Sequence, residues 1–146
     1  MLEVIDLRKV FKDVVAVNDV NMFLGRGESV GLVGPNGAGK STTIAMISTL
    51  IRPTSGDVKL NGASVLTNAA PMRAVLGVVP QEVALYPELS AQENLEFFGA
   101  LYGLRGTALS QAVDDALDLV GLSDRRRDVI KKYSGGMKRR INIAAA

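Results

Sequence analysis

The sequence has 146 residues and a formal net charge of +2, with 47% hydrophobic and 22% charged residues. This composition is typical of an ordinary globular domain, which excludes a disordered chain, and no segment is apolar enough for a membrane span or a signal peptide. The chain has no cysteine and no histidine, which excludes disulfides, zinc fingers, thiol nucleophiles and a Ser-His-Asp triad.

Five segments in the first half of the chain predict β-strands, because their apolar residues alternate or run together between turn residues. They are residues 2–6, 14–24, 29–33, 57–60 and 75–79. Residues 41–51 have no Gly or Pro and place apolar side chains at helical spacing. They therefore predict a helix directly after a glycine-rich loop.

The spacing of apolar residues changes at Ser90. Ser90 and Glu93 fit a capping box at the start of a helix. The apolar face of this helix is expected to consist of Leu95, Phe98, Leu101 and Tyr102. Residues 110–120 predict a second helix that Gly121 ends, and a third helix begins near Ser134 and reaches the last residue. A helical segment therefore follows a β-rich first part.

The glycine-rich loop is the strongest chemical signal, because residues 34–41 fit the phosphate-binding pattern G-x-x-x-x-G-K-[ST]. Glycines let successive backbone N–H groups face phosphate oxygens, and the next helix directs its positive N-terminal end at the same anion. Lys40 is expected to reach the β- and γ-phosphates, and the Ser41 hydroxyl to bind Mg²⁺. The expected nucleotide ligands in this segment are Gly34, Pro35, Asn36, Gly37, Ala38, Gly39, Lys40, Ser41 and Thr42. A glycine-rich turn that matches by chance is the alternative, but the predicted strand before it and helix after it favour a nucleoside triphosphate site.

A second motif identifies the kind of ATPase. Residues 133–140 read Tyr-Ser-Gly-Gly-Met-Lys-Arg-Arg, which resembles the L-S-G-G-Q signature of ATP-binding cassette (ABC) transporter ATPases. The resemblance covers the whole chain. It implies an α/β P-loop NTPase core with an N-terminal antiparallel β-subdomain and an α-helical signature subdomain. Residues 1–89 would form the β-subdomain and the P-loop core with its Q-loop, and residues 90–146 the helical subdomain up to the signature helix.

The resemblance also implies roles for residues outside the P-loop. Gln81 follows the predicted strand 75–79 as the family's Q-loop glutamine does, and it would touch Mg²⁺ or the attacking water. Phe11 lies where the family places an aromatic residue that stacks on adenine. Each has a structural alternative: Gln81 can be an ordinary polar residue at a strand end, and Phe11 can pack in a core, since it offers a π-face without a hydroxyl. With these roles, Lys40 and Gln81 are the expected catalytic residues, and Ser41 and Gln81 the expected metal ligands.

The signature would act on a different nucleotide. By resemblance, Ser134, Gly135 and Gly136 face the γ-phosphate of ATP held by the opposite subunit of a dimer. Ser134 can also be a simple helix N-cap, and the two interpretations are compatible, because a capped glycine-rich helix start is itself an anion site.

Two substitutions in the signature indicate a branch of the family. Met137 replaces the usual Gln and Tyr133 the usual Leu, a string that resembles the drug-export branch typified by daunorubicin-resistance ATPases. Residues 124–132 lack the T-E-V-G-E-like stretch of fused multidrug exporters. These features imply an ATPase subunit that pairs with separate membrane subunits at the cytoplasmic face of the cell membrane, and export of a drug or lipid-like substrate.

Basic residues are concentrated near the C-terminal end, where residues 121–146 carry eight Lys or Arg and two Asp or Glu. Such a run can bind nucleic acid. However, Tyr133 is the only aromatic residue within it, and single-strand binders add stacking platforms to charge. We therefore expect a solvated helical face and no nucleic-acid partner.

In the family, the signature helix is followed by the Walker B strand with its Mg²⁺-binding Asp and adjacent catalytic Glu, then by the D-loop and the switch His. The sequence given stops inside the expected signature helix, so we expect an N-terminal part that is inactive alone. The complete form would bind MgATP, dimerise head to tail as a homodimer or heterodimer, and drive transport through membrane subunits. The alternatives are a soluble ABC ATPase that acts on ribosomes or in DNA repair, and a module that senses ATP without turnover.

Overall fold

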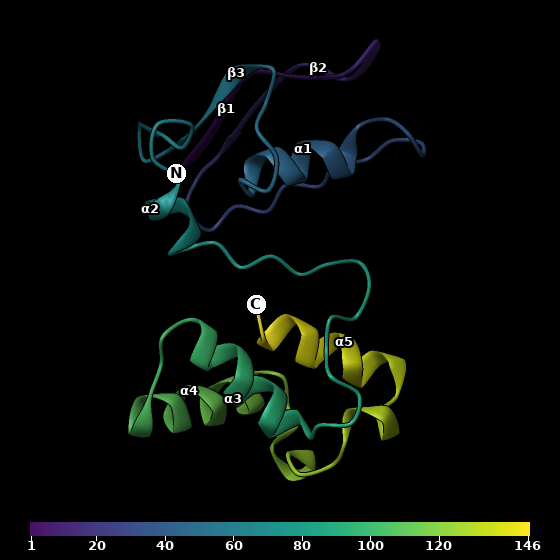
Figure 1. Ribbon diagram of the computed structural model, residues 1–146, viewed down its shortest axis with the longest axis vertical. Coiled ribbons are helices and arrows are strands. Elements are labelled where there is room, and N and C mark those ends of the chain that lie inside the picture. The colour runs from purple at the N-terminus through teal and green to yellow at the C-terminus, as the bar shows by residue number, and fades with distance from the viewer. The chain divides into compact units, whose positions relative to one another are not determined.

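The computed structural model describes residues 1–146, which form two units, Met1–Gly77 and Val78–Ala146 (Figure 1). Each unit has its own hydrophobic core. The chain is mixed α/β, with the strands in the first unit and most of the helical residues in the second. The expected division between subdomains at residue 89 stays a prediction.

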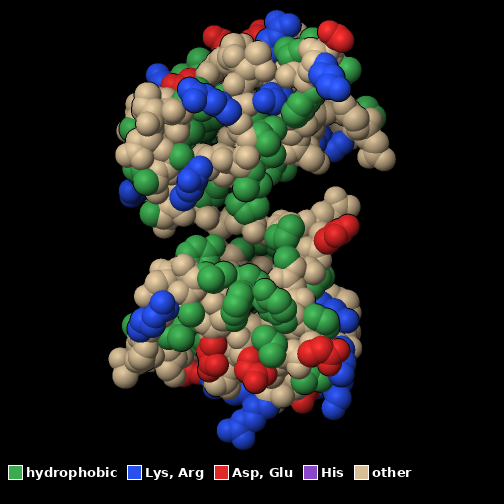
Figure 2. Space-filling view, in the orientation of Figure 1, with side chains coloured by type: hydrophobic (Ala, Val, Ile, Leu, Met, Phe, Trp, Pro, Cys, Tyr) green, Lys and Arg blue, Asp and Glu red, His purple; other side chains and the backbone are tan.

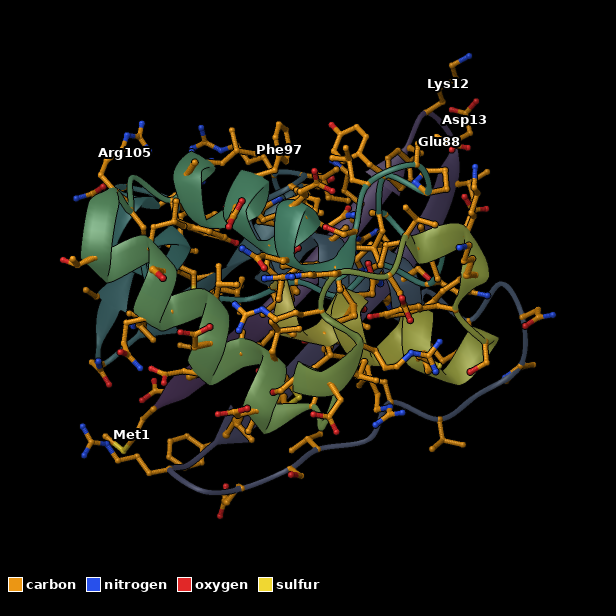
Figure 3. All side chains as sticks on the ribbon, turned by 90° about the horizontal axis from the view of Figure 1, so that it is seen from below. Met1, Lys12, Asp13, Glu88, Phe97 and Arg105 are labelled. Atoms are coloured by element: carbon orange, nitrogen blue, oxygen red, sulfur yellow. The ribbon has the colours of Figure 1, made fainter.

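The first unit contains a four-stranded antiparallel sheet with strand order β2-β1-β3-β4. The strands are β1 (Leu2–Phe11), β2 (Val14–Leu24), β3 (Ser55–Leu60) and β4 (Ala63–Ser64). β1 and β2 form a hairpin in which Phe11 pairs with Val14, and Figure 3 shows Lys12 and Asp13 at its tip. The strands predicted at 2–6, 14–24 and 57–60 are confirmed, and so is the antiparallel β-subdomain.

One face of the sheet packs against a hydrophobic core. Val4, Leu7 and Val58 are buried on the face that also receives Met46 of α1 (Lys40–Ile47). The short helix α2 (Ala70–Arg73) adds Met72 to the same core. Burial of each such side chain stabilises a fold by roughly 1.5–3 kcal/mol relative to leaving it exposed. This core therefore fixes α1, which carries Lys40 and Ser41 at its start.

Two predicted strands are wrong. Residues 29–33 and 75–79 form neither strand nor helix, and Val33 is 97% exposed. Their continuous apolar runs are typical of buried parallel strands. A strand exists only when its N–H and C=O groups pair with a neighbouring strand, however, and all the strand pairs of this chain join β1, β2, β3 and β4. Without such a neighbour, an apolar run does not become a strand.

The second unit is helical, as expected. It contains α3 (Ala91–Leu101), α4 (Gly106–Leu119), α5 (Gly135–Ala144) and the 3₁₀ turns η1 (Ser123–Arg125) and η2 (Ile130–Lys132). The capping box of Ser90 and Glu93 is confirmed, and Gly121 follows α4 with a φ of 63°. The core consists of Ala91, Leu95, Val113, Leu117, Leu122, Ile130, Tyr133 and Ile141.

The predicted apolar face of α3 is wrong in part. Leu95 is buried, whereas Leu101 is 69% exposed and Tyr102 is also exposed. Phe97, which was not expected on that face, packs against Tyr86 with ring centroids 4.9 Å apart, and Figure 3 shows it pointing away from α3. Hydrophobic side chains also reach the surface elsewhere in both units (Figure 2). The helical spacing of apolar residues correctly predicted that Leu95 is buried. It did not predict which apolar residues of the helix are exposed to solvent.

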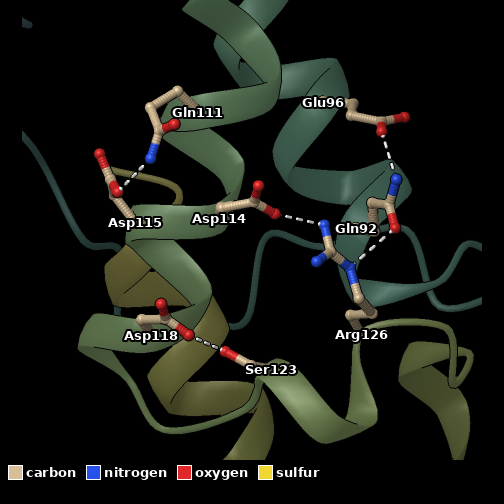
Figure 4. A network of polar contacts seen from close by, with 8 residues as sticks. All are labelled: Gln92, Glu96, Gln111, Asp114, Asp115, Asp118, Ser123 and Arg126. Atoms are coloured by element: carbon tan, nitrogen blue, oxygen red, sulfur yellow. Dashed lines mark hydrogen bonds and ion pairs between the residues drawn. The ribbon is translucent and has the colours of Figure 1, made fainter.

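A polar network ties α3, α4 and the segment after α4 together (Figure 4). The Arg126 guanidinium donates to Asp114 at 2.6 Å and to Gln92 at 3.0 Å. Ser123 hydrogen-bonds Asp118 in the same region. Part of the basic run is therefore used inside the unit. No helix of the chain is both long and apolar enough to cross a membrane.

Candidate nucleotide-binding site

The glycine-rich loop of residues 34–39 leads directly into α1. Gly37 and Gly39 both have a φ of 83°, a left-handed conformation that favours glycine. A Cβ on Gly39 would lie 2.3 Å from the carbonyl oxygen of Ala16. Glycine is therefore required at position 39 for two reasons: the left-handed backbone conformation and the close approach to β2.

The start of α1 presents free backbone donors. The amides of Lys40, Ser41 and Thr42 make no hydrogen bond within the chain, whereas the amide of Thr43 bonds the Gly39 carbonyl at 2.8 Å. The first turn of α1 has no acidic residue and no side-chain cap. These N–H groups and the helix dipole together make a site that favours an anion.

Lys40 lies over the loop. Its Nζ donates to the carbonyls of Gly34 at 2.7 Å and Pro35 at 2.6 Å, so the ammonium group is held at the loop that leads into the helix start. The Ser41 side chain is exposed at the helix start and makes no hydrogen bond. A lysine and a free hydroxyl at the start of one helix fit a triphosphate whose Mg²⁺ takes most of its ligands from phosphate and water. The chain has no group of three or more acidic side chains that could hold a metal by itself.

Phe11 lies at the end of β1 and is 47% exposed, so the alternative that it packs in the core is wrong. The Nζ of Lys9 lies 5.0 Å from the centre of its ring. The exposed ring keeps a π-face available, and its stacking on adenine remains a proposal.

Gln81 belongs to the second unit and lies in an irregular segment, not after a strand. Its backbone is held by α5: Arg139 Nη1 donates to the carbonyls of Pro80 at 2.7 Å and Gln81 at 3.0 Å. The side chain of Asn142, which is only 3% exposed, accepts from the amide of Ala84 at 3.1 Å. Sequence reasoning missed Arg139 and Asn142. The one available signal was a polar residue at position 142, directly after the apolar Ile141.

The signature motif forms the start of α5. The Ser134 hydroxyl accepts from the amide of Met137 at 3.3 Å, so the predicted N-cap is confirmed. A Cβ on Gly135 or Gly136 would meet no atom within 4 Å. Packing inside the unit therefore does not require glycine at either position. Because neither residue has a side chain, a ligand can come close to the backbone at the helix start.

Tyr133, which replaces the usual Leu, is buried in the core of the second unit. Its hydroxyl donates to the carbonyl of Arg125 at 2.7 Å. Burial raises the pKa of Tyr133 above its ordinary value, with a smaller contribution from Asp128. The hydroxyl thus stays protonated and hydrogen-bonded, so the substitution is accommodated without a buried unsatisfied group.

The structure thus brings the predicted residues together in two groups. Phe11, the P-loop, Lys40 and Ser41 belong to Met1–Gly77. Gln81 and the signature residues belong to Val78–Ala146, where Arg139 and Asn142 connect the segment at Gln81 to the signature helix.

Comparison with known proteins gives consistent results. Residues 17–146 match the protein family described as ABC transporter. The linearmycin resistance ATP-binding protein LnrL of Bacillus subtilis is 46% identical over 146 residues, which are all of this chain and 47% of the relative. The daunorubicin resistance ATP-binding protein DrrA3 of Streptomyces coeruleorubidus is 37% identical over 94% of this chain and 44% of the relative. The chain spans about half the length of these relatives.

Solved structures show the same fold. A structure titled as the ATP-binding subunit of an ABC transporter is 33% identical with a TM-score of 0.82, over 100% of this chain and 61% of that chain. A dimeric ATP-binding cassette, MJ0796, bound to ADP and phosphate is 26% identical with a TM-score of 0.82, over 99% of this chain and 68% of that chain. The family match, the relatives and the P-loop at the start of α1 agree, and the chain belongs to the ABC transporter family of ATP-binding proteins.

Proposed function

We propose that this chain is part of the ATP-binding subunit of an ABC exporter, which couples MgATP binding and hydrolysis to export of a drug or lipid-like substrate through separate membrane subunits. The observation that carries the proposal is the P-loop: free amides lie at the start of α1, and the Lys40 ammonium is held on the same loop, 2.7 Å and 2.6 Å from two loop carbonyls.

Nucleotide binding would use the first unit. The free amides of Lys40, Ser41 and Thr42 would donate to phosphate oxygens, and the Lys40 ammonium would exchange its loop carbonyls for the β- and γ-phosphates. The Ser41 hydroxyl would supply the protein ligand to Mg²⁺, with Gln81 as a second ligand. The exposed ring of Phe11 would stack on the adenine.

Hydrolysis would depend on positioning and electrostatics, because phosphoryl transfer to water needs little covalent chemistry from the protein. Lys40 and Mg²⁺ would stabilise charge on the transferred phosphoryl group. Gln81 would orient the attacking water from the same subunit. Ser134, Gly135 and Gly136 would approach the γ-phosphate of the partner subunit's ATP, and the open helix start at both glycines supports this assignment.

The names of the relatives support the direction of transport. Linearmycin resistance, daunorubicin resistance and Nod factor export are named for proteins that are 46%, 37% and 38% identical to this chain. A further structural neighbour, cbiO1 of Clostridium perfringens, is described as part of the complex cbiONQ. We infer a subunit that lies at the cytoplasmic face of the membrane and is held there by membrane subunits.

Two measurements test this function, both on the full-length protein. Affinity purification from a detergent extract should recover membrane-spanning subunits with it, and the purified complex should hydrolyse ATP only with Mg²⁺. Ribosomal proteins or DNA-repair proteins in place of membrane subunits would contradict the exporter assignment and favour the soluble alternative. Mg²⁺-dependent ATP binding without phosphate release by the intact complex would contradict the ATPase and favour the ATP-sensing module.

A further inference from the structure

A pocket of about 170 Å³ opens in the first unit, away from the P-loop in sequence. Its walls come from the end of α1, the segment that leads to β3, the segment after β4, and α2. The lining residues are Met46, Thr49, Ile51, Arg52, Val65, Leu66, Ala69 and Arg73. None of them belongs to residues 34–42, so binding here does not rest on the proposed nucleotide site.

The pocket combines an apolar floor with two positive charges. Met46 and Val65 are buried and continuous with the core, whereas Arg52 and Arg73 are exposed at the rim. No carboxylate lines the pocket, and all three ion pairs of the chain lie in the second unit. Both guanidinium groups therefore lack an acidic partner.

Two of the carbonyls at the end of α1 are already bonded to backbone amides. The amides of Thr49 and Leu50 bond the carbonyls of Met46 at 3.1 Å and Ala45 at 2.9 Å, which closes the helix. These bonds place Thr49 in the left-handed region, with a φ of 61°. Glycine takes this position at a helix end without strain, and a β-branched residue does not.

The strained Thr49 has a specific contact. Its Oγ1 accepts from Nε of Arg73 at 3.0 Å, which fixes one edge of the guanidinium and leaves the terminal N–H groups without a partner. Strained residues that persist in a fold cluster at ligand sites. Thr49 thus sets the direction of Arg73 at the pocket rim.

Size and chemistry together define the occupant. A cavity of about 150 Å³ accommodates benzene, and pockets for drug-sized molecules or nucleotides are about 300 Å³ or larger. Guanidinium groups bind carboxylates through two parallel hydrogen bonds. A ring or branched alkyl group on the Met46 and Val65 floor, with a carboxylate at the rim, would satisfy both halves of the pocket.

We propose that this pocket binds a small organic acid: a monocarboxylate with a compact aromatic or branched apolar body. The carboxylate pairs with Arg73 and Arg52, and the apolar body lies against Met46 and Val65. Thr49 is a positioning residue that acts through Arg73.

Methionine methyl groups report on this site, because the sequence has five methionines and one of them, Met46, lines the pocket. The full-length protein is labelled with ¹³C at the methionine methyl groups and titrated with benzoate. The Met46 signal should shift saturably, with a Kd of about 1 mM or tighter. The Met137 signal, from the second unit, should not move. Benzamide, which lacks the charge, and acetate, which lacks the apolar body, should each bind at least about tenfold more weakly.

Four variants complete the test. Arg73→Gln and Arg52→Gln should each weaken benzoate binding at least about fivefold, and Lys12→Gln, which removes one charge at the hairpin tip, should leave the affinity unchanged. Thr49→Gly should raise the melting temperature by relieving the strain and still weaken benzoate binding, which a merely structural role of Thr49 would not produce. The proposal is overturned by an unmoved Met46 signal, by equal binding of benzamide or acetate, or by unchanged affinity in both arginine variants.

Discussion

The guanidinium of Arg139 donates to the backbone carbonyl of Gln81 at 3.0 Å, and the same nitrogen reaches the neighbouring carbonyl of Pro80 at 2.7 Å. Arg139 lies on the signature helix α5, five residues after Ser134. One side chain therefore links the segment that carries the proposed water-orienting glutamine to the helix that would face the partner's ATP.

Arg139→Gln should lower ATP turnover without a comparable change in KM for ATP. The variant loses the hydrogen bonds that position Gln81, and a loss of about 1.4 kcal/mol corresponds to tenfold in rate. Arg139→Lys keeps the charge but not the planar donor group, so it should restore turnover only in part. Steady-state ATP hydrolysis by the intact transporter measures both.

Arg140→Gln is the matched control. Arg140 lies on the same helix and donates to the carbonyl of Val120 at 2.7 Å, so its loss removes a bond of the same kind that does not reach the Q-loop segment. It should cost similar stability and leave turnover near the wild-type value. Equal turnover losses in the two variants would show that Arg139 acts only through stability.

Lys40→Ala should weaken MgATP binding by at least about a hundredfold. A triphosphate would lose its nearest fixed positive charge, and charge-assisted hydrogen bonds contribute roughly 1.5–3 kcal/mol each. Isothermal calorimetry measures the affinity, with Lys12→Ala at the exposed hairpin tip as the control for loss of one lysine (Figure 3). Equal affinity of wild type and Lys40→Ala would contradict the P-loop assignment.

Ser134→Arg should leave ATP binding to one subunit nearly intact and reduce ATP-dependent dimerisation and turnover, because the side chain would face the partner's nucleotide. Ser134→Ala removes the same N-cap bond to Met137, which contributes about 1 kcal/mol, but adds no bulk. Sedimentation with and without ATP separates the two effects. If the Ser134→Arg protein lost affinity for ATP as a single subunit but still dimerised, the assignment of Ser134 to the partner's nucleotide would be wrong.

The capping box gives a pH prediction for the second unit. The backbone amide of Ser90, and next its hydroxyl, donate to the Glu93 carboxylate and lower the pKa of that group below its usual 4.5. A lowered folded-state pKa contributes stability above the unfolded value, and this contribution is lost as pH falls through the folded value. Glu93→Gln keeps the box geometry without the charge. Its urea midpoint should lie below that of wild type at pH 7, and the difference should shrink as the pH falls below the usual value and through the lowered folded-state pKa of Glu93. A difference that does not shrink on acidification would contradict the assignment.

Local patterns predicted what depends on local contacts. The capping box at Ser90 and the N-cap at Ser134 each involve residues within a few positions of one another, and both predictions were correct. The P-loop was predicted for the same reason, since its glycines, lysine and serine lie within eight consecutive residues at the start of α1.

Several features that need distant partners were missed. The apolar runs at 29–33 and 75–79 have the composition of strands, but no neighbouring strand pairs with them. Arg139 and Asn142 contact a segment nearly 60 positions earlier in the chain, and no spacing rule connects positions so far apart. The pocket at Arg73 likewise depends on four segments that meet only in the fold.

Residues 1–146 expressed alone should show no Mg²⁺-dependent ATP hydrolysis and should associate into oligomers. The first expectation is chemical. The segment has no histidine and no cluster of acidic side chains that could hold the metal or orient the attacking water. The second is physical. Val30, Val33 and Val75 are exposed on segments with no strand partner, and exposed apolar segments of this kind drive association. Sedimentation and a phosphate-release assay on the purified segment measure both. A stable monomer with turnover near the low end of typical enzymes, about 1 s⁻¹, would contradict both expectations at once.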